Sequence, residues 1–578
     1  MAPLRGLLRS SIALCSAAAC LCAAACSEPE PEWPDQFGYA TSAQFLTVNA
    51  GSELGATTGA DAIASRLFPG VFVHGPEGQF IPSRDFATAS VVDVPGVAGP
   101  APFYSGEGSV PDAPAGSVID YVIAQGARYS DDVEVTCDDF LLAFTAGVMK
   151  ETFHSAVPLM HQVDHVDCAP GAKQFRLFFK PGLGSRWREL FSPGTVMPSH
   201  VVAQAVGLDS QQLVDALDRR DPDELASVAE AYGAAFRLDT PEGVSIPSSG
   251  PFMIESRTPE GALILVRNEA YPGDPAELDK IYMWPAGADV ARLAANNDLE
   301  IADLVGSGFP AWVDRDDPKN RFDVQSVEGD LNEVLALGNA GVFASNAARR
   351  AFASCVDPVA VAAASSKVAG VEVAPMGLRL TTADDPINDN LSDIAQAHIT
   401  ADVVGAEVLR DATVRIGYVG PDPRKAAMVQ AIAASCAQAG VTVVDVSDQA
   451  SYPSDVIRTS DASDYGFGAA QSEDPAAQWS QSWSVSEVID GAADALLVAI
   501  DPYYSYPTSN ATVSDVESLR AEEQRLWSTV PTVPLSVQPR TLVFDRRVAN
   551  VVAHTALAGI GWNMDRWAQA QEGEKKIA

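Results

Sequence analysis

The chain has 578 residues, of which 47% are hydrophobic and 20% are charged. Its formal net charge of −38 becomes −40 when Arg5 and Arg9, the only charged residues before Cys26, are set aside. This length predicts about two to four compact regions with an ample core, and the acidic charge argues against nucleic acid and anionic lipid surfaces as partners.

The first 25 residues have the pattern of an export signal. Arg5 and Arg9 precede an apolar stretch that is too short to cross a bilayer, and small residues stand directly before Cys26. We interpret Cys26 as the acylated residue of a lipoprotein, with Cys20 as a second candidate. We expect a signal peptide over 1–25, a Pro- and Glu-rich tether over 26–36, and a lipid anchor on the outer, extracytoplasmic face of the cell membrane. An ordinary secretory leader with incidental cysteines is the alternative.

Among the predicted elements, residues 44–48 (Gln-Phe-Leu-Thr-Val) indicate a strand, and residues 60–68 indicate a helix that follows a loop rich in Gly and Thr. Further along, residues 414–418 predict a buried strand, residues 423–439 an Ala-rich helix that ends at Gly440, and residues 441–444 the next strand. The last three elements form a βαβ unit, so we expect a parallel sheet in that part of an α/β chain.

Four cysteines belong to the folded part, and none has the spacing of a zinc site or a CxxC motif. An exported protein meets an oxidising compartment, so disulfides are expected. Cys137 and Cys168 are the preferred pair because they are close in sequence, and a loop of that length contributes about 3 to 4 kcal/mol in the chain-entropy model. Cys355 and Cys436 fall in predicted helices and could form a second disulfide or remain small buried thiols.

Enzymatic and metal chemistry find little support in the motifs. His161 and His165 look at first like metal ligands, but their segment predicts a strand pair, and positions four residues apart on a strand are separated by about 13 Å. We therefore expect no metal site there. The motifs Gly-x-Ser-x-Gly, Ser-x-x-Lys and His-Glu-x-x-His do not occur. We expect a protein without catalytic residues or cofactors, and a secreted hydrolase is the alternative.

Five stretches point to a family by their order and spacing, although none is specific alone. They are residues 126–140 (Gly-Ala-Arg-Tyr-Ser-Asp-Asp, then Val-Thr-Cys-Asp-Asp-Phe), 197–201 (Met-Pro-Ser-His-Val), 249–281 (Ser-Gly-Pro-Phe, Val-Arg-Asn-Glu-Ala-Tyr, Leu-Asp-Lys-Ile), 349–358 (Arg-Arg-Ala-Phe, Cys-Val-Asp-Pro) and 533–535 (Val-Pro-Leu). Together they resemble extracellular solute-binding protein family 5, the oligopeptide-, dipeptide- and nickel-binding components of ABC importers. Tyr129 and Asp132 replace the family's usual Trp and Gly.

The resemblance implies a two-lobe, periplasmic-binding-protein-like α/β fold of the cluster C type, with a hinge and an additional sub-lobe. The chain would cross to the second lobe near Trp284 and Pro285, and return between Thr529 and Leu535. Solute would lie in the cleft between the lobes of a monomer that delivers it to an ABC permease. The expected parts are lobe I (37–75, 190–285 and 530–578), the extra sub-lobe (76–189) and lobe II (286–529).

The resemblance also implies which residues contact the solute. On lobe I they are Gly55, Ala56, Thr57 and Thr58, for which a plain surface loop is the alternative. On the facing lobe they are Gly468, Ala469, Ala470 and Gln471, since small residues allow a close approach of the backbone. Trp479 and Trp483 follow at helical spacing and are expected either to wall the cleft or to lie in the core.

One departure from the family pattern indicates the chemical class of the solute. Peptide-binding relatives carry an aspartate four residues before a proline, where it pairs with the ammonium group of the peptide. Here the proline is Pro475 and the matching residue is Gln471, although Glu473 or Asp474 could substitute if the loop is shifted. We expect peptides with free N-termini to bind poorly, because a buried charge loses its partner. A blocked or modified peptide, or a non-peptide such as a glycan or a metal chelate, is expected instead.

Overall fold

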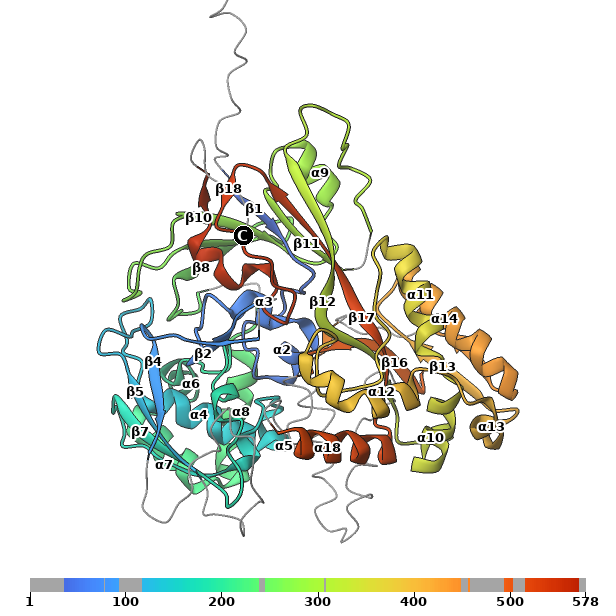
Figure 1. The fold of residues 1–578 in the computed structure, drawn as a ribbon. Helices are drawn as coiled ribbons and strands as arrows, with labels where there is room; N and C mark the ends of the chain where they lie inside the picture. Colours follow the sequence, from blue (N-terminus) through green and yellow to red (C-terminus); the bar gives the residue numbers. More distant parts are fainter. Residues whose placement is uncertain are drawn as a thin grey trace, which may run out of the picture.

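A single mixed sheet of eleven strands joins the two halves of the molecule (Figure 1). The computed structural model describes residues 36–76, 78–92, 117–238, 245–305, 308–448, 456–457, 493–502 and 515–570. The strand order is β14-β13-β16-β12-β17-β11-β1-β10-β9-β8, and β15 also pairs with β16. The strands are β1 (Gly38–Ala40), β8 (Phe252–Arg257), β9 (Leu263–Arg267), β10 (Lys280–Trp284), β11 (Ile301–Val305), β12 (Phe322–Leu337), β13 (Thr413–Gly417), β14 (Thr442–Asp445), β15 (Val456–Ile457), β16 (Ala495–Ile500) and β17 (Thr532–Asp545).

Lobe I is the part built on β8, β9, β10, β1 and β11. Strand β1 lies in its middle and pairs in parallel with both β10 and β11. A side chain at Gly38 would bring Cβ to 1.9 Å from the carbonyl oxygen of Asp298, so this position accepts only glycine. The N–H of Gly38 donates to the buried carboxylate of Glu300 at 2.6 Å. These contacts hold the start of the described chain against the middle of the sheet.

Two long antiparallel strands, β12 and β17, carry the sheet from lobe I into lobe II (Figure 1). The chain crosses outward along β12 and returns along β17, and every residue of β17 is buried. The register of the pair shifts between Glu328 and Asn332, which marks a bulge midway along the crossing. The outward crossing expected near Trp284 lies earlier than this, because β11 still follows in lobe I. The return begins at Thr532, within the expected stretch.

Lobe II is built on β16, β13 and β14, which are mutually parallel. The βαβ unit predicted from the sequence is present as β13, α14 (Pro423–Cys436) and β14, and Gly440 ends the helical segment with φ of 79°. Asp422 caps α14 by accepting from the N–H groups of Arg424 and Lys425. A disulfide joins Cys355 to Cys436, and thereby α10 to α14. The other helices are α10 (Asn346–Cys355), α11 (Pro358–Ala369), α12 (Ser392–His398), α13 (Val403–Ala406) and α18 (Val516–Thr529).

A second sheet forms the extra sub-lobe, in the order β4-β5-β7-β6. Its strands are β4 (Ala87–Val91), β5 (Val118–Ile123), β6 (Val163–Asp167) and β7 (Gln174–Phe179), and they pack on α4 (Cys137–Val148). Tyr121 and Phe175 stack on neighbouring strands with ring centroids 4.8 Å apart. Cys137 and Cys168, the pair expected from their closeness in sequence, form a disulfide. The apolar core of the sub-lobe is continuous with that of lobe I.

Shorter elements complete the described chain. They are the helices α2 (Glu53–Thr58), α3 (Ala60–Ala64), α5 (Lys150–Phe153), α6 (Ser199–Val206), α7 (Ser210–Arg219), α8 (Pro222–Ala234) and α9 (Val290–Ala295), and the strands β2 (Phe72–His74), β3 (Phe80–Pro82), β18 (Val548–Ala549) and β19 (Ala568–Gln569). Short 3-10 turns cover Met160–Gln162, Trp187–Glu189, Gly341–Phe343, Pro386–Leu391, Glu407–Leu409, Ala437–Ala439 and Ile560–Arg566.

Two local predictions near the start of the chain are wrong. Residues 44–48 are irregular and form only an isolated β-bridge between Thr47 and Arg237. The first strand of the described residues is instead β1. The Gly- and Thr-rich stretch is not a loop but helix α2, capped by the Ser52 hydroxyl, which accepts from the N–H of Gly55. Gly59, with φ of 72°, ends α2 and begins α3. The expected helix over 60–68 is therefore only its first turn.

Candidate functional site

The two lobes approach each other where helix α2 of lobe I lies beside strand β15 of lobe II. Strand β15 runs parallel to β16, with Val456 opposite Ala499 and Ile457 opposite Ile500. The carboxyl ends of β13 and β16 lie at the same edge of the lobe II sheet, where α14 also begins. Crevices outside the carboxyl ends of parallel strands are where α/β proteins bind ligands. This juxtaposition defines the candidate site, and it lies next to the crossing strands.

Helix α2 contains the four residues predicted to contact solute from lobe I. The N–H of Gly55 donates to the Ser52 hydroxyl at 3.0 Å, and the N–H of Ala56 donates to the Ser52 carbonyl at 2.9 Å. These two donors are therefore used inside the helix and are not offered to an extended peptide. A Cβ at Gly55 would stand 1.9 Å from the carbonyl oxygen of Asn49, so tight packing accounts for this glycine. Contact of Ala56, Thr57 or Thr58 with solute stays a prediction.

The residues predicted on the facing lobe lie outside the described part of the chain. These are Gly468, Ala469, Ala470, Gln471, Trp479 and Trp483, together with Glu473 and Asp474. The predicted lipidation site, Cys26, also lies outside it. Strand β15 is the described segment that precedes the first group, and it lies beside α2.

A buried ion pair stands where the crossing strands meet lobe I. Asp303 on β11 accepts from Nε of Arg540 on β17 at 3.0 Å and also from Nη2 of the same guanidinium. The second carboxylate oxygen of Asp303 accepts from the N–H of Ile560 at 3.2 Å. The side chains are only 1% and 4% exposed, so each charge depends on the other for its compensation. The pair ties β11 and β17 to the C-terminal segment, which is the chain that follows β17 over residues 546–570.

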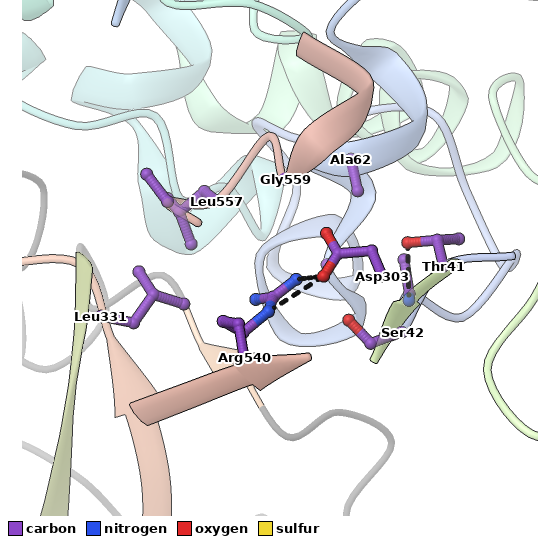
Figure 2. Close-up of a pocket in the computed structure, with 11 residues that line it drawn as sticks. Thr41, Ser42, Ala62, Asp303, Leu331, Arg540, Leu557 and Gly559 are labelled. Atoms are coloured by element: carbon purple, nitrogen blue, oxygen red, sulfur yellow. Dashed lines mark hydrogen bonds and ion pairs between the residues drawn. The ribbon is translucent and has the colours of Figure 1, made fainter. Parts of the chain in front are cut away.

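Beside this ion pair is a small pocket that opens to solvent (Figure 2). Small residues dominate its wall, and the two larger apolar side chains, Leu331 and Leu557, come from β12 and from the C-terminal segment. Ser42 and Arg540 supply polar groups. The lining residues are Thr41, Ser42, Ala43, Gly59, Ala62, Asp303, Leu331, Arg540, Ala556, Leu557 and Gly559. Because the wall combines lobe I loops with both crossing strands, the pocket lies at the hinge.

Sequence reasoning missed Asp303 and Arg540. The signal that could have found Asp303 is a single charge inside an otherwise apolar strand, Ile-Ala-Asp-Leu-Val over 301–305. A lone charge in such a strand needs a buried partner, because desolvation without compensation is costly. Arg540 gives a weaker signal of the same kind in β17.

A second buried cluster supports the lobe II edge of the site. Both terminal nitrogens of Arg424 on α14 donate to the carboxylate of Glu333 on β12 at 2.6 Å, and Nη1 also donates to the Ser365 hydroxyl at 3.1 Å. The neighbouring Lys425 donates from Nζ to the carbonyl oxygen of Leu497 at 3.2 Å. Burial lowers the pKa of Lys425 to about 8. This cluster fixes the start of α14 against the crossing strand.

The C-terminal segment is fastened to the bulge of β12. The hydroxyl of Thr555 donates to the carboxylate of Asp330 at 2.7 Å and accepts from the Asp330 N–H at 2.8 Å. The adjacent His554 is buried, and desolvation lowers its pKa to about 4, so the imidazole is neutral at physiological pH. The hinge therefore includes residues far apart in sequence.

The described residues that resemble catalytic or metal-binding groups are engaged in structural contacts. The Ser199 hydroxyl donates to the buried Asp139 at 2.6 Å, whereas His200 pairs with Asp131 at 2.9 Å, so the serine has no histidine base. Cys137, Asp138 and Cys168 gather three potential metal ligands, but both sulfur atoms belong to a disulfide. His165 lies on β6, paired with β7 as expected, while His161 precedes that strand in a 3-10 turn.

Among the described residues, no helix has the length and apolar character needed to cross a membrane.

Solved structures share this architecture. A periplasmic EDTA-binding protein matches with a TM-score of 0.63 at 16% identity, covering 94% of this chain and 97% of its own. The oligopeptide-binding protein of Bacillus subtilis in complex with a nonapeptide matches with a TM-score of 0.61 at 11% identity, covering 93% and 100%. That of Thermus thermophilus complexed with a pentapeptide gives 0.59 at 15% identity, covering 94% and 98%. The fold is therefore that of the two-lobe periplasmic solute-binding proteins.

Sequence comparison narrows this class to a family. An uncharacterized lipoprotein of Mycobacterium tuberculosis is 31% identical over 565 residues, which cover 93% of each chain. One of Mycobacterium leprae is 30% identical over 559 residues, covering 92% of this chain and 93% of its own. The sequence profile described as bacterial extracellular solute-binding proteins, family 5 middle, matches residues 112–486. The chain belongs to bacterial extracellular solute-binding protein family 5, which confirms the resemblance found in its motifs.

Proposed function

We propose that this protein is the lipid-anchored substrate-binding component of an ABC importer, which captures a peptide or peptide-like solute between its lobes and delivers it to a membrane permease. The observation that carries the proposal is the approach of α2 to β15 beside two crossing strands, within a fold that belongs to a solute-binding family. A solute in that position contacts both lobes, so it stabilises the closed state over the open one. We infer a binding role without catalysis.

A non-peptide solute is the second candidate, and the ligands of the structural relatives support it. Proteins of this fold include one in complex with agropinic acid and one in complex with nickel bound to L-histidine, besides those that hold peptides. The fold therefore does not select one chemical class. The neutral Gln471, where peptide-binding relatives place a carboxylate, supports a blocked peptide, a glycan or a metal chelate over a simple peptide.

Intact-mass spectrometry of the gently purified protein tests the proposal by looking for a co-purified small molecule. The identified compound should raise the melting temperature by mass action and make the protein more compact in solution scattering, and it should be recovered unchanged. Conversion of the compound at a rate that depends on protein concentration would instead favour the secreted hydrolase.

Calorimetric titration distinguishes the two solute classes. Pools of di- to pentapeptides with free N-termini should bind poorly, and N-acetylated pools should bind no worse. Submicromolar binding that vanishes on N-acetylation would contradict the assignment of a blocked or non-peptide solute. If Glu473→Gln or Asp474→Asn then abolished that binding, the substituted residue would be the carboxylate that pairs with the ammonium group.

A further inference from the structure

Two polar groups that line the pocket beside Asp303 and Arg540 form no hydrogen bond with a described residue. Asp303 accepts hydrogen bonds from Nε and Nη2 of Arg540. No hydrogen bond joins Nη1 of Arg540 to any described residue. The hydroxyl of the half-buried Ser42 likewise has no hydrogen-bond partner within the described ranges. Both residues line the pocket, and Figure 2 shows the Ser42 oxygen on the side that faces Arg540. Two of the residues that line the pocket therefore offer it a guanidinium N–H and a hydroxyl.

The charge balance of the pocket selects between the groups that could accept these hydrogen bonds. The positive charge of Arg540 is already neutralised by Asp303, and both side chains are almost completely buried. A carboxylate placed on Nη1 would add a second negative charge to one guanidinium in a region of low dielectric, where uncompensated charge is costly. Asp330, which is fastened to Thr555 in the adjacent segment, adds further negative charge. An uncharged oxygen avoids this cost.

The shape of the pocket limits the size of the group. Ala43, Gly59, Ala62 and Gly559 add little side-chain volume to the wall, and Leu331 and Leu557 are its two larger apolar side chains. At Gly559 a Cβ would approach a carboxylate oxygen of Asp303 to 2.7 Å, so glycine keeps this wall open without displacing the ion pair. Such a wall admits a small polar group carried by a larger solute that extends into the space between the lobes.

We propose that this pocket receives an uncharged oxygen-bearing group of the solute, a carbonyl or a hydroxyl, and that it rejects a carboxylate. Nη1 of Arg540 and the Ser42 hydroxyl form the hydrogen bonds, and Asp303 holds the guanidinium in position. This rests on the proposed function and specifies the chemistry of one end of the solute. It makes Arg540 and Ser42 residues that determine specificity.

Three small probes test this selectivity by saturation-transfer NMR at millimolar concentration. Acetamide and acetate have the same shape but differ in charge, and glucose presents hydroxyl groups. We expect acetamide or glucose to bind and acetate not to bind at this pocket, and the better of the two neutral probes distinguishes a carbonyl from a hydroxyl. The experiment uses the full protein and the variants Ser42→Ala and Leu557→Trp, with Ser90→Ala on the exposed edge of β4 as a control.

Ser42→Ala should weaken the neutral probe about fivefold, which corresponds to one hydrogen bond. Leu557→Trp should remove its signal by filling the pocket, while Ser90→Ala leaves it unchanged. A melting temperature near that of the wild type shows that each variant is folded. If Leu557→Trp is not folded, the comparison of Ser42→Ala with the wild type remains as the test. The proposal is overturned if the variants lose the binding signal of acetate rather than that of a neutral probe, or if neither variant alters the signal of any probe. A co-purified solute that Leu557→Trp still retains would overturn the pocket assignment while leaving the binding function intact.

Discussion

At the scale of single residues, buried charges decide how the hinge is held. The carboxylate of Asp303 and the guanidinium of Arg540 are each removed from water, and their hydrogen bonds offset the loss of hydration. The family motifs in the sequence do not include either residue, because motif reasoning looks for clusters in sequence, whereas this pair is separated by 237 positions. The pairing of a lone charge inside an apolar strand depends on the strand order, which the sequence alone leaves open.

Removing one member of this pair should be far more damaging than removing both. Asp303→Ala leaves Arg540 buried without a counter-charge, and we expect a loss of about 3 to 5 kcal/mol in the free energy of unfolding. The double variant Asp303→Leu with Arg540→Met should recover a large part of that loss, as measured by urea denaturation. Asp393→Ala is the control, since its exposed pair with Arg520 is expected to contribute no more than about 1 kcal/mol. A double variant as unstable as Asp303→Ala would contradict this.

Lys425 should make stability depend on alkaline pH. Its ordinary pKa is 10.5, and burial lowers the pKa to about 8 in the folded protein. Between these values the unfolded chain binds more protons than the folded one, so the free energy of unfolding contributed by this group rises with pH from 8 to 10.5. Below pH 8 the cost of burying the charge is fully present. Lys425→Met should lose this rise in urea denaturation, whereas Lys367→Met, an exposed site on α11, should keep it. Equal slopes in both variants would show that Lys425 does not titrate in this window.

At the scale of elements, local sequence patterns predicted the helices and strands well where those elements depend on nearby residues. They failed where long-range packing determines the element. The βαβ unit of β13, α14 and β14 follows from an apolar strand, a capped helix and Gly440, all of which act within about thirty residues. Helix α2 was missed because Gly and Thr have poor helix propensity, and packing against Asn49 outweighs that propensity. The crossing was placed too early because β12 (Phe322–Leu337) carries several charged residues and changes its burial midway along.

The disulfides join elements that the hydrogen-bond ladders leave separate. Cys355–Cys436 connects α10 with α14 across 81 residues, and Cys137–Cys168 connects α4 with the end of β6 across 31. We expect the double variant Cys355→Ser with Cys436→Ser to lose about 2 to 5 kcal/mol, chiefly through the greater freedom of its unfolded chain. Thermal unfolding without reductant measures the loss, and Cys137→Ser with Cys168→Ser provides the comparison. The double variant retains Cys137–Cys168, so a reductant that lowers the melting temperature of the wild type by more than that of the double variant assigns the difference to Cys355–Cys436. An unchanged melting temperature in the double variant would show that the bond adds nothing.

At the scale of the whole molecule, the fold and the family follow from the sequence more fully than the site does. The order of short motifs identified family 5, because such motifs mark turns and strand ends that the fold requires. The residues predicted to face the solute from lobe II lie outside the described chain, and on lobe I the N–H groups of Gly55 and Ala56 are already used within α2. The contacts of a cleft depend on how two lobes meet, and residue patterns within one lobe do not contain that information.

The proposed lipid anchor concerns the whole molecule, and a single substitution tests it. Cys26→Ala should release the protein from the membrane fraction, because stable attachment needs two or more acyl chains and all of them depend on the modified cysteine. Fractionation followed by immunoblotting measures the release, and Cys20→Ala is the matched control, which should remain bound. Unchanged attachment of the Cys26 variant would contradict the lipoprotein assignment.

The continuous sheet has a consequence for how the molecule loses its structure. Lobes connected by flexible linkers can melt one after the other, whereas here β12 and β17 belong to the hydrogen-bonded ladders of both lobes. Unfolding either lobe would strip partners from the strands that the other lobe needs, so the two should act as one cooperative unit. We expect a single calorimetric transition whose van't Hoff and calorimetric enthalpies agree, and the slowest amide hydrogen exchange along β17. Two resolved transitions would mean that the bulge between Glu328 and Asn332 uncouples the lobes.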